Sequence, residues 1–288
     1  MTQIFEQMTI VGVGLIGGSM ARKAREEGLV KKIIGFGRTK RNLENALSLG
    51  VIDRYESDLM KAVEGSDLVV IATPVEKSIE IISDLLPKLG PNTIVTDVGS
   101  VKGKVVDVFR ECKDLKTEFI GGHPIAGTES SGVESSFASL FEEHITILTP
   151  IERNSQISID RLKSFWIGLG AKVELLDPEK HDRILSDISH LPHVVAYALV
   201  NAVLDGDGIS YAAGGFKDFT RIASSNPEMW SEICVQNRKS ILSSIKNFRD
   251  HLDSIYELIE NADGNSIEKL FQNSKNGRDS WLNEKGQK

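Results

Sequence analysis

The pattern of hydrophobic positions divides the chain into two parts near residue 177. In the first part, short apolar runs typical of buried parallel strands alternate with helix-compatible stretches. The runs that predict strands lie at residues 9–11, 32–38, 67–72, 94–98, 144–148 and 171–176, and a further strand ends within residues 119–129. From residue 179 onward, strand signals vanish and helical periodicity takes over. The pattern predicts an α/β domain over residues 1–177 and an all-helical domain over residues 178–288.

A glycine-rich turn follows the first predicted strand with the spacing G-x-G-x-x-G. Gly12 permits the tight turn, Gly14 lets the backbone approach a pyrophosphate, and Gly17 lets the next helix pack closely on the strand. The N–H groups at the helix start, which includes Leu15 and Ile16, then face the phosphates. A glycine turn without a ligand is the alternative. The strand before it and the helix after it favour a Rossmann-type, doubly wound sheet that binds a dinucleotide.

The residues after the second predicted strand bear on which dinucleotide is bound. Sheets of this kind that bind NAD place an acidic residue here for the ribose hydroxyl, whereas an arginine accepts a 2′-phosphate. This chain has no acid at this point and has Arg38 instead. The arginine tilts the expectation toward NADP⁺. The alternative, that Arg38 stacks on the adenine or lies in solvent, leaves both NAD⁺ and NADP⁺ open.

Polar residues follow two further strands at their carboxyl ends, where open α/β sheets bind their ligands. Thr73 and Pro74 end one strand, and Ser100 and Lys102 follow the next. We expect chemistry at this edge, with Thr73, Pro74 and Ser100 against the cofactor. Ser100 is also a suitable N-cap for the following helix. Asp97 is expected to be a structural residue rather than an acid catalyst.

A histidine lies in the next strand exit, between two glycines and a proline. Pro124 stiffens the backbone, while Gly121, Gly122 and Gly127 allow a ligand to approach closely. A histidine near a nicotinamide can act as the base for oxidising an alcohol. We therefore expect His123 to be catalytic. The alternative is a solvent-exposed loop histidine.

Three histidines gather at the start of the helical part. His190 and His193 are three residues apart and share a helical face, and His181 lies upstream. No carboxylate or cysteine pattern accompanies them, so we expect no metal site and expect His193 to face the substrate. The segment Tyr197–Leu204 is apolar nearly all round, which predicts a buried central helix or a helix at a subunit interface. Residues 233–260 predict one long amphipathic helix or two helices.

A basic and aromatic segment follows two glycines, of which Gly214 is the first. Arg221 lies between apolar neighbours, which predicts a guanidinium held in a cleft for a carboxylate. The alternative for Arg221 is an intramolecular ion pair. Pro227 is expected to begin another helix, and Trp230 is expected in the core. The tail from Asn261 is polar and is expected to fray.

Charge and composition narrow the function classes. The 288 residues carry a formal net charge of −7 without a basic run, which argues against nucleic acid as a partner. Cys112 and Cys234 lie far apart, as is usual for reduced cysteines of a cytosolic protein. Residues 1–7 do not resemble a signal peptide, and no apolar run approaches the roughly 20 residues that span a bilayer. We expect a cytoplasmic protein that binds a small molecule and no membrane.

Five sequence elements, taken together, point to one family. They are Gly-Val-Gly-Leu-Ile-Gly-Gly-Ser at 12–19, Asp-Val-Gly-Ser-Val-Lys at 97–102, Gly-His-Pro-Ile-Ala-Gly-Thr-Glu at 122–129, Ser-His-Leu-Pro-His at 189–193 and Phe-Thr-Arg-Ile-Ala at 219–223. With them the chain resembles, over nearly its whole length, the prephenate/arogenate (cyclohexadienyl) dehydrogenase family of tyrosine biosynthesis. The third and fourth elements are specific, whereas many oxidoreductases share the glycine loop. The length resembles that of a monofunctional dehydrogenase, without a chorismate mutase or a regulatory ACT domain.

The resemblance implies a Rossmann-type domain followed by an all-helical domain that forms a homodimer. It also implies oxidative decarboxylation of prephenate to 4-hydroxyphenylpyruvate with NAD⁺ or NADP⁺. His123 would accept a hydrogen bond from the ring hydroxyl as hydride leaves, and Ser100 would orient His123 and the nicotinamide. Arg221 would hold a substrate carboxylate. The other residues of the implied substrate pocket are His193, Thr128, Gly214 and, at its entrance, Glu129.

Three alternatives stay open. Arogenate differs from prephenate only in an amino group in place of the side-chain keto group, and no residue here distinguishes the two. A pyrroline-5-carboxylate reductase or a β-hydroxyacid dehydrogenase would share the glycine loop and the helical domain, although the latter normally needs a lysine base where this chain has His190 and His193. A non-catalytic dinucleotide sensor would have no reason to place four polar side chains around one cleft, those of His123, Ser100, His193 and Arg221.

Overall fold

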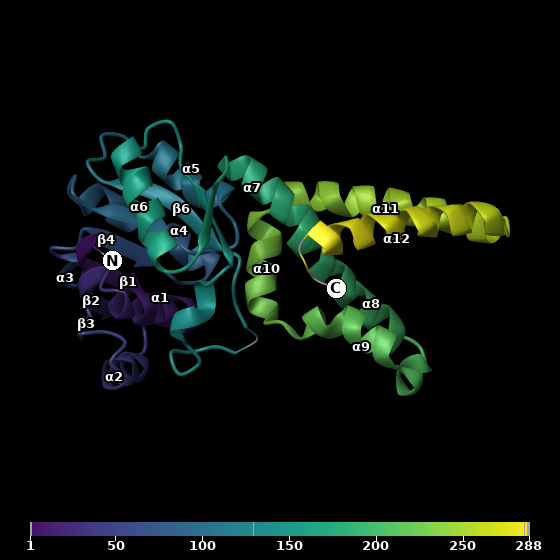
Figure 1. Cartoon of the computed structure of the whole chain (residues 1–288), viewed down its shortest axis with the longest axis horizontal. Coiled ribbons are helices and arrows are strands. Elements are labelled where there is room, and N and C mark those ends of the chain that lie inside the picture. Colours follow the sequence, from purple (N-terminus) through teal and green to yellow (C-terminus); the bar gives the residue numbers. More distant parts are fainter. Residues whose placement is uncertain (1, 129, 285, 287–288) are drawn as a thin grey trace. The chain divides into compact units, whose positions relative to one another are not determined.

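The first part of the chain forms one open sheet in the computed structural model, which describes residues 2–128, 130–284 and 286. Its eight strands lie in the order β3-β2-β1-β4-β5-β6-β7-β8. Figure 1 shows the sheet among its surrounding helices. Neighbouring strands are parallel except β6 and β7, which are antiparallel. The strands are β1 (Phe5–Val11), β2 (Val30–Phe36), β3 (Arg54–Glu56), β4 (Leu68–Ile71), β5 (Ile94–Asp97), β6 (Glu118–Pro124), β7 (Ile145–Thr149) and β8 (Lys172–Leu175). The helices between them are α1 (Leu15–Glu26), α2 (Lys40–Ser48), α3 (Leu59–Val63), α4 (Val75–Leu85), α5 (Gly103–Glu111) and α6 (Gln156–Gly168).

The predicted doubly wound α/β fold is confirmed, and each predicted apolar run overlaps a strand. The strand order reverses between β1 and β4, which is where such a sheet opens a crevice for its ligand. β3 was not predicted. It has three residues, none of them buried, so it lacks the apolar run that identifies a strand.

The glycine turn after β1 has the conformation that its sequence requires. Gly12 has φ +100°, and a Cβ there would lie 2.4 Å from the Ala72 carbonyl oxygen. At Gly17 a Cβ would lie 2.6 Å from the carbonyl oxygen of Gly12, so the first glycine and the last are needed for packing. Around Gly14, which precedes α1 directly, a Cβ would meet no atom of the described residues within 4 Å. The open space at Gly14 is available to a ligand.

Aromatic side chains hold α6 against the sheet. Phe165 and Trp166 of α6 are fully buried. The Phe165 ring meets Phe5 of β1 edge to face at 5.5 Å between centroids, and Trp166 meets Phe141 in the same way at 5.3 Å. All four side chains belong to the main hydrophobic core.

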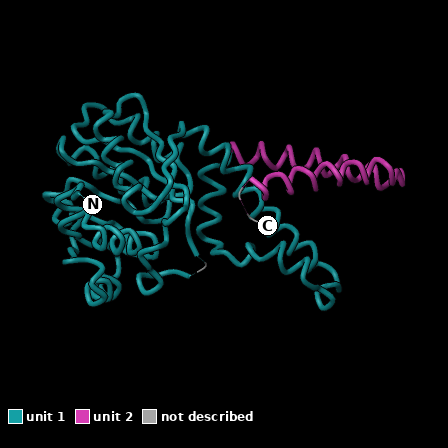
Figure 2. The backbone as a smooth tube through the Cα atoms, viewed as in Figure 1, with its two compact units in different colours: residues 1–238 teal, residues 239–288 magenta. Residues whose placement is uncertain are grey.

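After β8 the described chain consists of helices joined by short turns. Its helices are α7 (Pro178–Leu185), α8 (Leu191–Leu204), α9 (Gly214–Thr220), α10 (Pro227–Gln236), α11 (Arg238–Glu260) and α12 (Gly264–Glu284). A π-helical turn, Ser186–His190, joins α7 to α8, and Pro227 begins α10 as expected. The chain divides into two compact units, residues 1–238 and 239–288 (Figure 2).

The structure contradicts one expectation for the helical part and narrows another. The tail beyond Asn261 does not fray but forms α12, because apolar residues at positions 267, 270 and 271 follow helical spacing among good helix formers. The helix over Tyr197–Leu204 is not buried within the single chain. In α8, all of which is described, Ala196 is the one buried residue, and Leu204 is 56% exposed.

Apolar side chains also line one face of α11. Phe248, Leu252, Tyr256 and Ile259 follow at intervals of four, four and three residues, so they share a helical face, and each is exposed in the single chain. We call these four residues the α11 stripe. No helix among the described residues is long and apolar enough to cross a bilayer.

A buried ion pair ties β5 to β6. Lys102 and Asp97 are both fully buried, and the Lys102 ammonium donates to the Asp97 carboxylate and to the Gly122 carbonyl oxygen, the latter at 2.7 Å. Asp97 also accepts from the N–H groups of Gly99 at 2.9 Å and Gly122 at 3.2 Å. Burial lowers the pKa of Lys102, and Asp97 opposes this effect. Asp97 is structural, as expected, and Lys102 shares that role rather than facing a ligand.

Replacing Lys102 with methionine should therefore destabilise the fold strongly, because Asp97 would keep a buried charge without its cation. We expect Lys102→Met to lower the free energy of unfolding by about 3–5 kcal/mol in urea titration. The matched control is Lys31→Met, which breaks an exposed pair with Glu6 and should leave the unfolding midpoint unchanged. A Lys102→Met protein as stable as the wild type would show that the pair does not hold β5 to β6.

Candidate active site

His123 lies within strand β6, near its carboxyl end, and not in a loop. Its side chain is 8% exposed, which excludes the alternative of a solvent-exposed histidine. The flanking glycines serve the packing of β6 rather than a ligand, which corrects the expectation for them. A Cβ at Gly121 would lie 2.4 Å from the Thr149 hydroxyl, and one at Gly122 would lie 2.7 Å from the Asp97 carbonyl oxygen. A Cβ at Gly127 would meet none of the described atoms within 4 Å.

A chain of hydrogen bonds leads from His123 into helix α7. His123 Nδ1 lies 2.8 Å from His181 Nε2, and His181 Nδ1 lies 2.8 Å from Asp182 Oδ1. The Asp182 carboxylate also accepts from the backbone N–H groups of Lys102 at 2.7 Å and Gly103 at 2.8 Å. Asp182 therefore caps α5 at its N-terminus, the role for which Ser100 was an alternative.

Burial disfavours the protonated form of both His123 and His181. Burial lowers the pKa of His123 well below its usual range, and the nearby His181, Lys102 and His190 lower it further. Burial likewise lowers the pKa of His181, although the Asp182 carboxylate opposes this effect. A neutral, buried imidazole has a free lone pair and can accept a proton from a ligand.

A second pair of histidines lies beside Trp230. His190 is buried, and its Nδ1 lies 3.1 Å from Nδ2 of Asn237. The same Asn237 amide donates to the Asp182 carbonyl oxygen at 2.8 Å. Burial lowers the pKa of His190 to about 4. His193 stacks on the Trp230 indole at 3.6 Å between ring centroids. Trp230 is buried, as expected, and it also positions a histidine.

The orientation of His193 is fixed by the main chain. Its Nδ1 lies 2.9 Å from the Ser189 carbonyl oxygen, which can only accept, so Nδ1 carries the proton and Nε2 has the lone pair. Burial is the main reason that the pKa of His193 is lowered, and the positive charge of Arg221 lowers it further. Arg221 therefore lies within electrostatic range of His193. It is exposed and begins a short 3₁₀ turn after α9.

The remaining residues expected at the substrate are Thr128, Gly214 and Glu129. Thr128 is exposed, and its hydroxyl accepts from the Ser130 N–H at 3.2 Å. Gly214 begins α9, and a Cβ there would meet none of the described atoms within 4 Å. Glu129 lies outside the described residues. Among the residues that the structure describes, no three His, Cys, Asp or Glu side chains gather as metal ligands.

The residues expected to hold the cofactor lie at the carboxyl ends of β1, β2, β4 and β5. Leu15 and Ile16 form the first turn of α1, which has no side-chain cap, so its N–H groups are open to an anion. Thr73 is half-buried with its hydroxyl 2.9 Å from that of Ser78, and Pro74 precedes α4. Ser100 is half-buried in the loop before α5, and Arg38 is exposed after β2. An uncapped helix start beside the open space at Gly14 fits a dinucleotide pyrophosphate.

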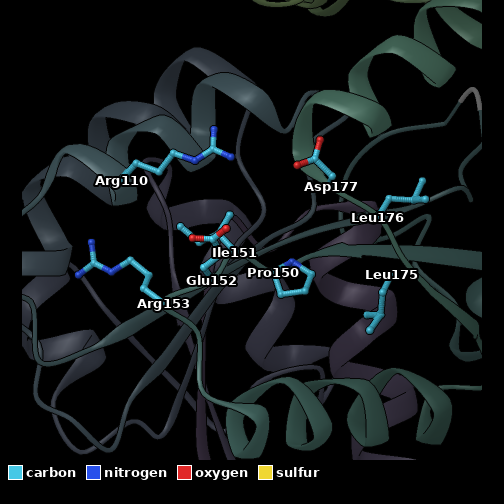
Figure 3. Close-up of a pocket in the computed structure, with 8 residues that line it drawn as sticks. All are labelled: Arg110, Pro150, Ile151, Glu152, Arg153, Leu175, Leu176 and Asp177. Atoms are coloured by element: carbon cyan, nitrogen blue, oxygen red, sulfur yellow. The ribbon is translucent and has the colours of Figure 1, made fainter.

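A cavity of about 670 Å³ lies at the opposite edge of the sheet (Figure 3). It is lined by Arg110, Pro150, Ile151, Glu152, Arg153, Leu175, Leu176 and Asp177. Its two arginines already have partners in the fold, because Arg110 pairs with Glu179 and Asp107 while Arg153 donates to the Phe109 carbonyl oxygen at 2.7 Å. None of the residues expected at the catalytic site lines this cavity.

His181 and Asp182 are the parts of the site that sequence reasoning missed. His181 was noted only as a member of a histidine cluster, and Asp182 was not singled out. His181 contacts His123, which is 58 residues away in the sequence. Asp182 accepts from Lys102 at the start of α5, which is 80 residues away. Contacts between residues so far apart leave no local motif in the sequence. The one available signal for this part of the site was a histidine next to an aspartate.

Two family models match this chain, one in each part. The prephenate dehydrogenase nucleotide-binding domain matches residues 20–175, and the prephenate dehydrogenase dimerization domain matches residues 177–273. Prephenate dehydrogenase of Bacillus subtilis is 36% identical over 99% of this chain and 79% of its own length. Cyclohexadienyl dehydrogenase of Zymomonas mobilis is 33% identical over 96% of each chain.

This chain is also similar to solved structures. Prephenate dehydrogenase from Aquifex aeolicus, in complex with hydroxyphenyl propionate and NAD⁺, has a TM-score of 0.89 and 37% identity over 96% of this chain and 98% of its own. Synechocystis arogenate dehydrogenase has a TM-score of 0.82 and 31% identity over 96% and 99% of the two chains. The chain, with its nucleotide-binding sheet followed by a helical dimerisation domain, belongs to the prephenate dehydrogenase family.

Proposed function

We propose that this protein catalyses the oxidative decarboxylation of prephenate to 4-hydroxyphenylpyruvate with a nicotinamide dinucleotide. The observation that carries the proposal is His123, a buried neutral histidine at the dinucleotide edge of the sheet whose ring is held through Nδ1. The relatives support the reaction class, since they include prephenate, cyclohexadienyl and arogenate dehydrogenases. Arogenate is therefore the second candidate substrate.

In this proposal His123 acts as the base. Its Nε2 accepts the proton of the ring hydroxyl as hydride leaves the carbon that bears it. When bound, the nicotinamide supplies the hydride acceptor. The electron pair of the breaking bond to the ring carboxylate then makes the ring aromatic and releases carbon dioxide. Ser100, at the β5 exit, is proposed to orient His123 and the nicotinamide.

Cationic and polar groups are proposed to hold the substrate. Arg221 would bind a substrate carboxylate, because its charge lies within range of His193, which offers its Nε2 to the same ligand. Thr128, Gly214 and Glu129 complete the proposed pocket.

The cofactor site is proposed to consist of Gly12, Gly14, Leu15, Ile16, Gly17, Arg38, Thr73, Pro74 and Ser100. Its support is the open space at Gly14 and the uncapped start of α1. Exposed Arg38 and the absence of an acid after β2 favour NADP⁺, whereas the Aquifex aeolicus relative holds NAD⁺.

We further propose a boundary between the cofactor-binding and the helical domain at residues 177 and 178. Its support is that β8 ends at Leu175 and that Asp177 caps α7. We infer that the helical domain joins two copies of this chain, as its family description indicates. A cytoplasmic location is also proposed, since Cys112 and Cys234 are both free thiols.

Turnover of prephenate and of arogenate, each with NAD⁺ and with NADP⁺, tests the proposed function through the nicotinamide absorbance. We expect oxidation of at least one substrate by the wild type. His123→Asn should lower kcat by about 10²–10⁴-fold and leave KM little changed, because the base acts mainly in the transition state.

His144→Asn is the matched control, because His144 is exposed before β7 and should be dispensable. Absence of turnover in all four combinations, with folded protein that binds a dinucleotide, would refute the proposed function. Wild-type turnover by His123→Asn would refute only the assignment of the base.

Arg221→Ala should raise KM for the substrate by about tenfold or more and change kcat less, because a carboxylate would lose its charged donor. The comparison is Lys217→Ala, which removes an exposed cation from neighbouring α9 and should leave KM unchanged. Equal KM values for the two variants would contradict the role of Arg221.

A further inference from the structure

We infer that His181 and Asp182 form a positioning pair that sets which nitrogen of His123 carries the proton, so that His123 meets the substrate with a free lone pair on Nε2. The inference deepens the proposed function and rests on it. Neither residue touches the substrate in this scheme. Asp182 acts on His181, and His181 acts on His123 through the 2.8 Å contacts between them.

Asp182 determines which group donates and which accepts in each of these hydrogen bonds. Backbone N–H groups can only donate, and those of Lys102 and Gly103 occupy Oδ1 and Oδ2 of the carboxylate. An ionised carboxylate has no proton to give. The 2.8 Å contact with His181 therefore requires His181 Nδ1 to be the donor.

The protonation of His181 follows from this contact. A neutral imidazole carries one proton, and at His181 that proton is on Nδ1. Its Nε2 is then an acceptor, and the group 2.8 Å away is His123 Nδ1. His123 must donate from Nδ1, which leaves its Nε2 with a lone pair.

The opposite arrangement is disfavoured by the same geometry. A proton on His181 Nε2 instead of Nδ1 would turn a lone pair toward the Asp182 carboxylate, and the two would repel each other. A doubly protonated His181 could donate to both neighbours, but its ring is fully buried and burial disfavours the charged form. Neutral histidine in water favours a proton on Nε2, so the fold would be selecting the less common form at both rings.

The proton step can then be written with one transfer. The hydroxyl proton goes to His123 Nε2, and His123 becomes an imidazolium that keeps its Nδ1–H bond to His181. His181 keeps its own proton on Nδ1, facing the negative charge of Asp182. The new positive charge is thus stabilised through His181 without any further proton movement.

Nitrogen-15 spectra of the full-length protein, labelled at its histidines, measure the protonation of each ring independently of activity. We expect His123 and His181 each to carry a single proton on Nδ1 near pH 8. Signals are assigned by their loss in His123→Asn and His181→Asn. A proton on Nε2 of His123 in the wild type would overturn the inference, whatever the enzyme's activity.

Two substitutions at His181 separate positioning from a structural role. His181→Gln places an amide oxygen near the former Nε2, where it can still accept from His123. His181→Asn reaches only as far as the former Nδ1, so it keeps a donor to Asp182 and loses the contact with His123. We expect His181→Asn to lower kcat by about 10²-fold with KM for the dinucleotide unchanged, and His181→Gln to recover most of that loss.

The outcomes also distinguish the two proposals. Wild-type kcat in a folded His181→Asn protein, or equal losses in both variants, would overturn the positioning role while the proposed function stands. If the wild type oxidises neither prephenate nor arogenate, the proposed function fails. In that case the positioning role fails with it, while the spectra still report the protonation of the two rings.

Discussion

The carboxylate of Asp182 is the interaction on which the arrangement of this site depends. Helix α5 begins at Gly103, and the side chain of its N-cap residue, Lys102, does not cap it. Asp182 supplies the missing acceptors from 79 and 80 residues away, while its own carbonyl oxygen accepts from Asn237 beyond α10. One residue thus joins the start of α5 to α7 and to the end of α10. Without it, the N–H groups of Lys102 and Gly103 at the start of α5 would lose these acceptors.

Around His123 the fold combines two buried charged groups with neutral imidazoles. The Lys102 ammonium bonds the carbonyl oxygen of Gly122, the residue before His123, and Asp97 bonds the N–H of that same glycine. The backbone of β6 is therefore held from the β5 side by the ion pair, while the His123 ring is held from the α7 side by His181. Such fixed polar contacts need no rearrangement when charge develops on a ligand.

Local features of the chain were predictable because their causes are local. The turn at Gly12, the strand runs and the proline at the start of α10 each follow from residues next to one another. Contacts across long stretches of chain were not predictable. Gly121 and Gly122 were interpreted as space for a ligand, and only the fold shows Thr149 and Asp97 packed against them. The roles of Ser100, Thr128, Gly214 and Arg38 stay predictions.

The α11 stripe has a thermodynamic consequence. Phe248, Leu252, Tyr256 and Ile259 expose apolar area in one chain, within a domain that its family describes as a dimerization domain. A second chain that covers the stripe binds the folded form and not the unfolded one, so it acts as a stabilising ligand. Mass action then links folding to concentration. In the dimer that we propose, the melting temperature would therefore depend on the protein concentration as well as on the sequence, and dilution would lower it.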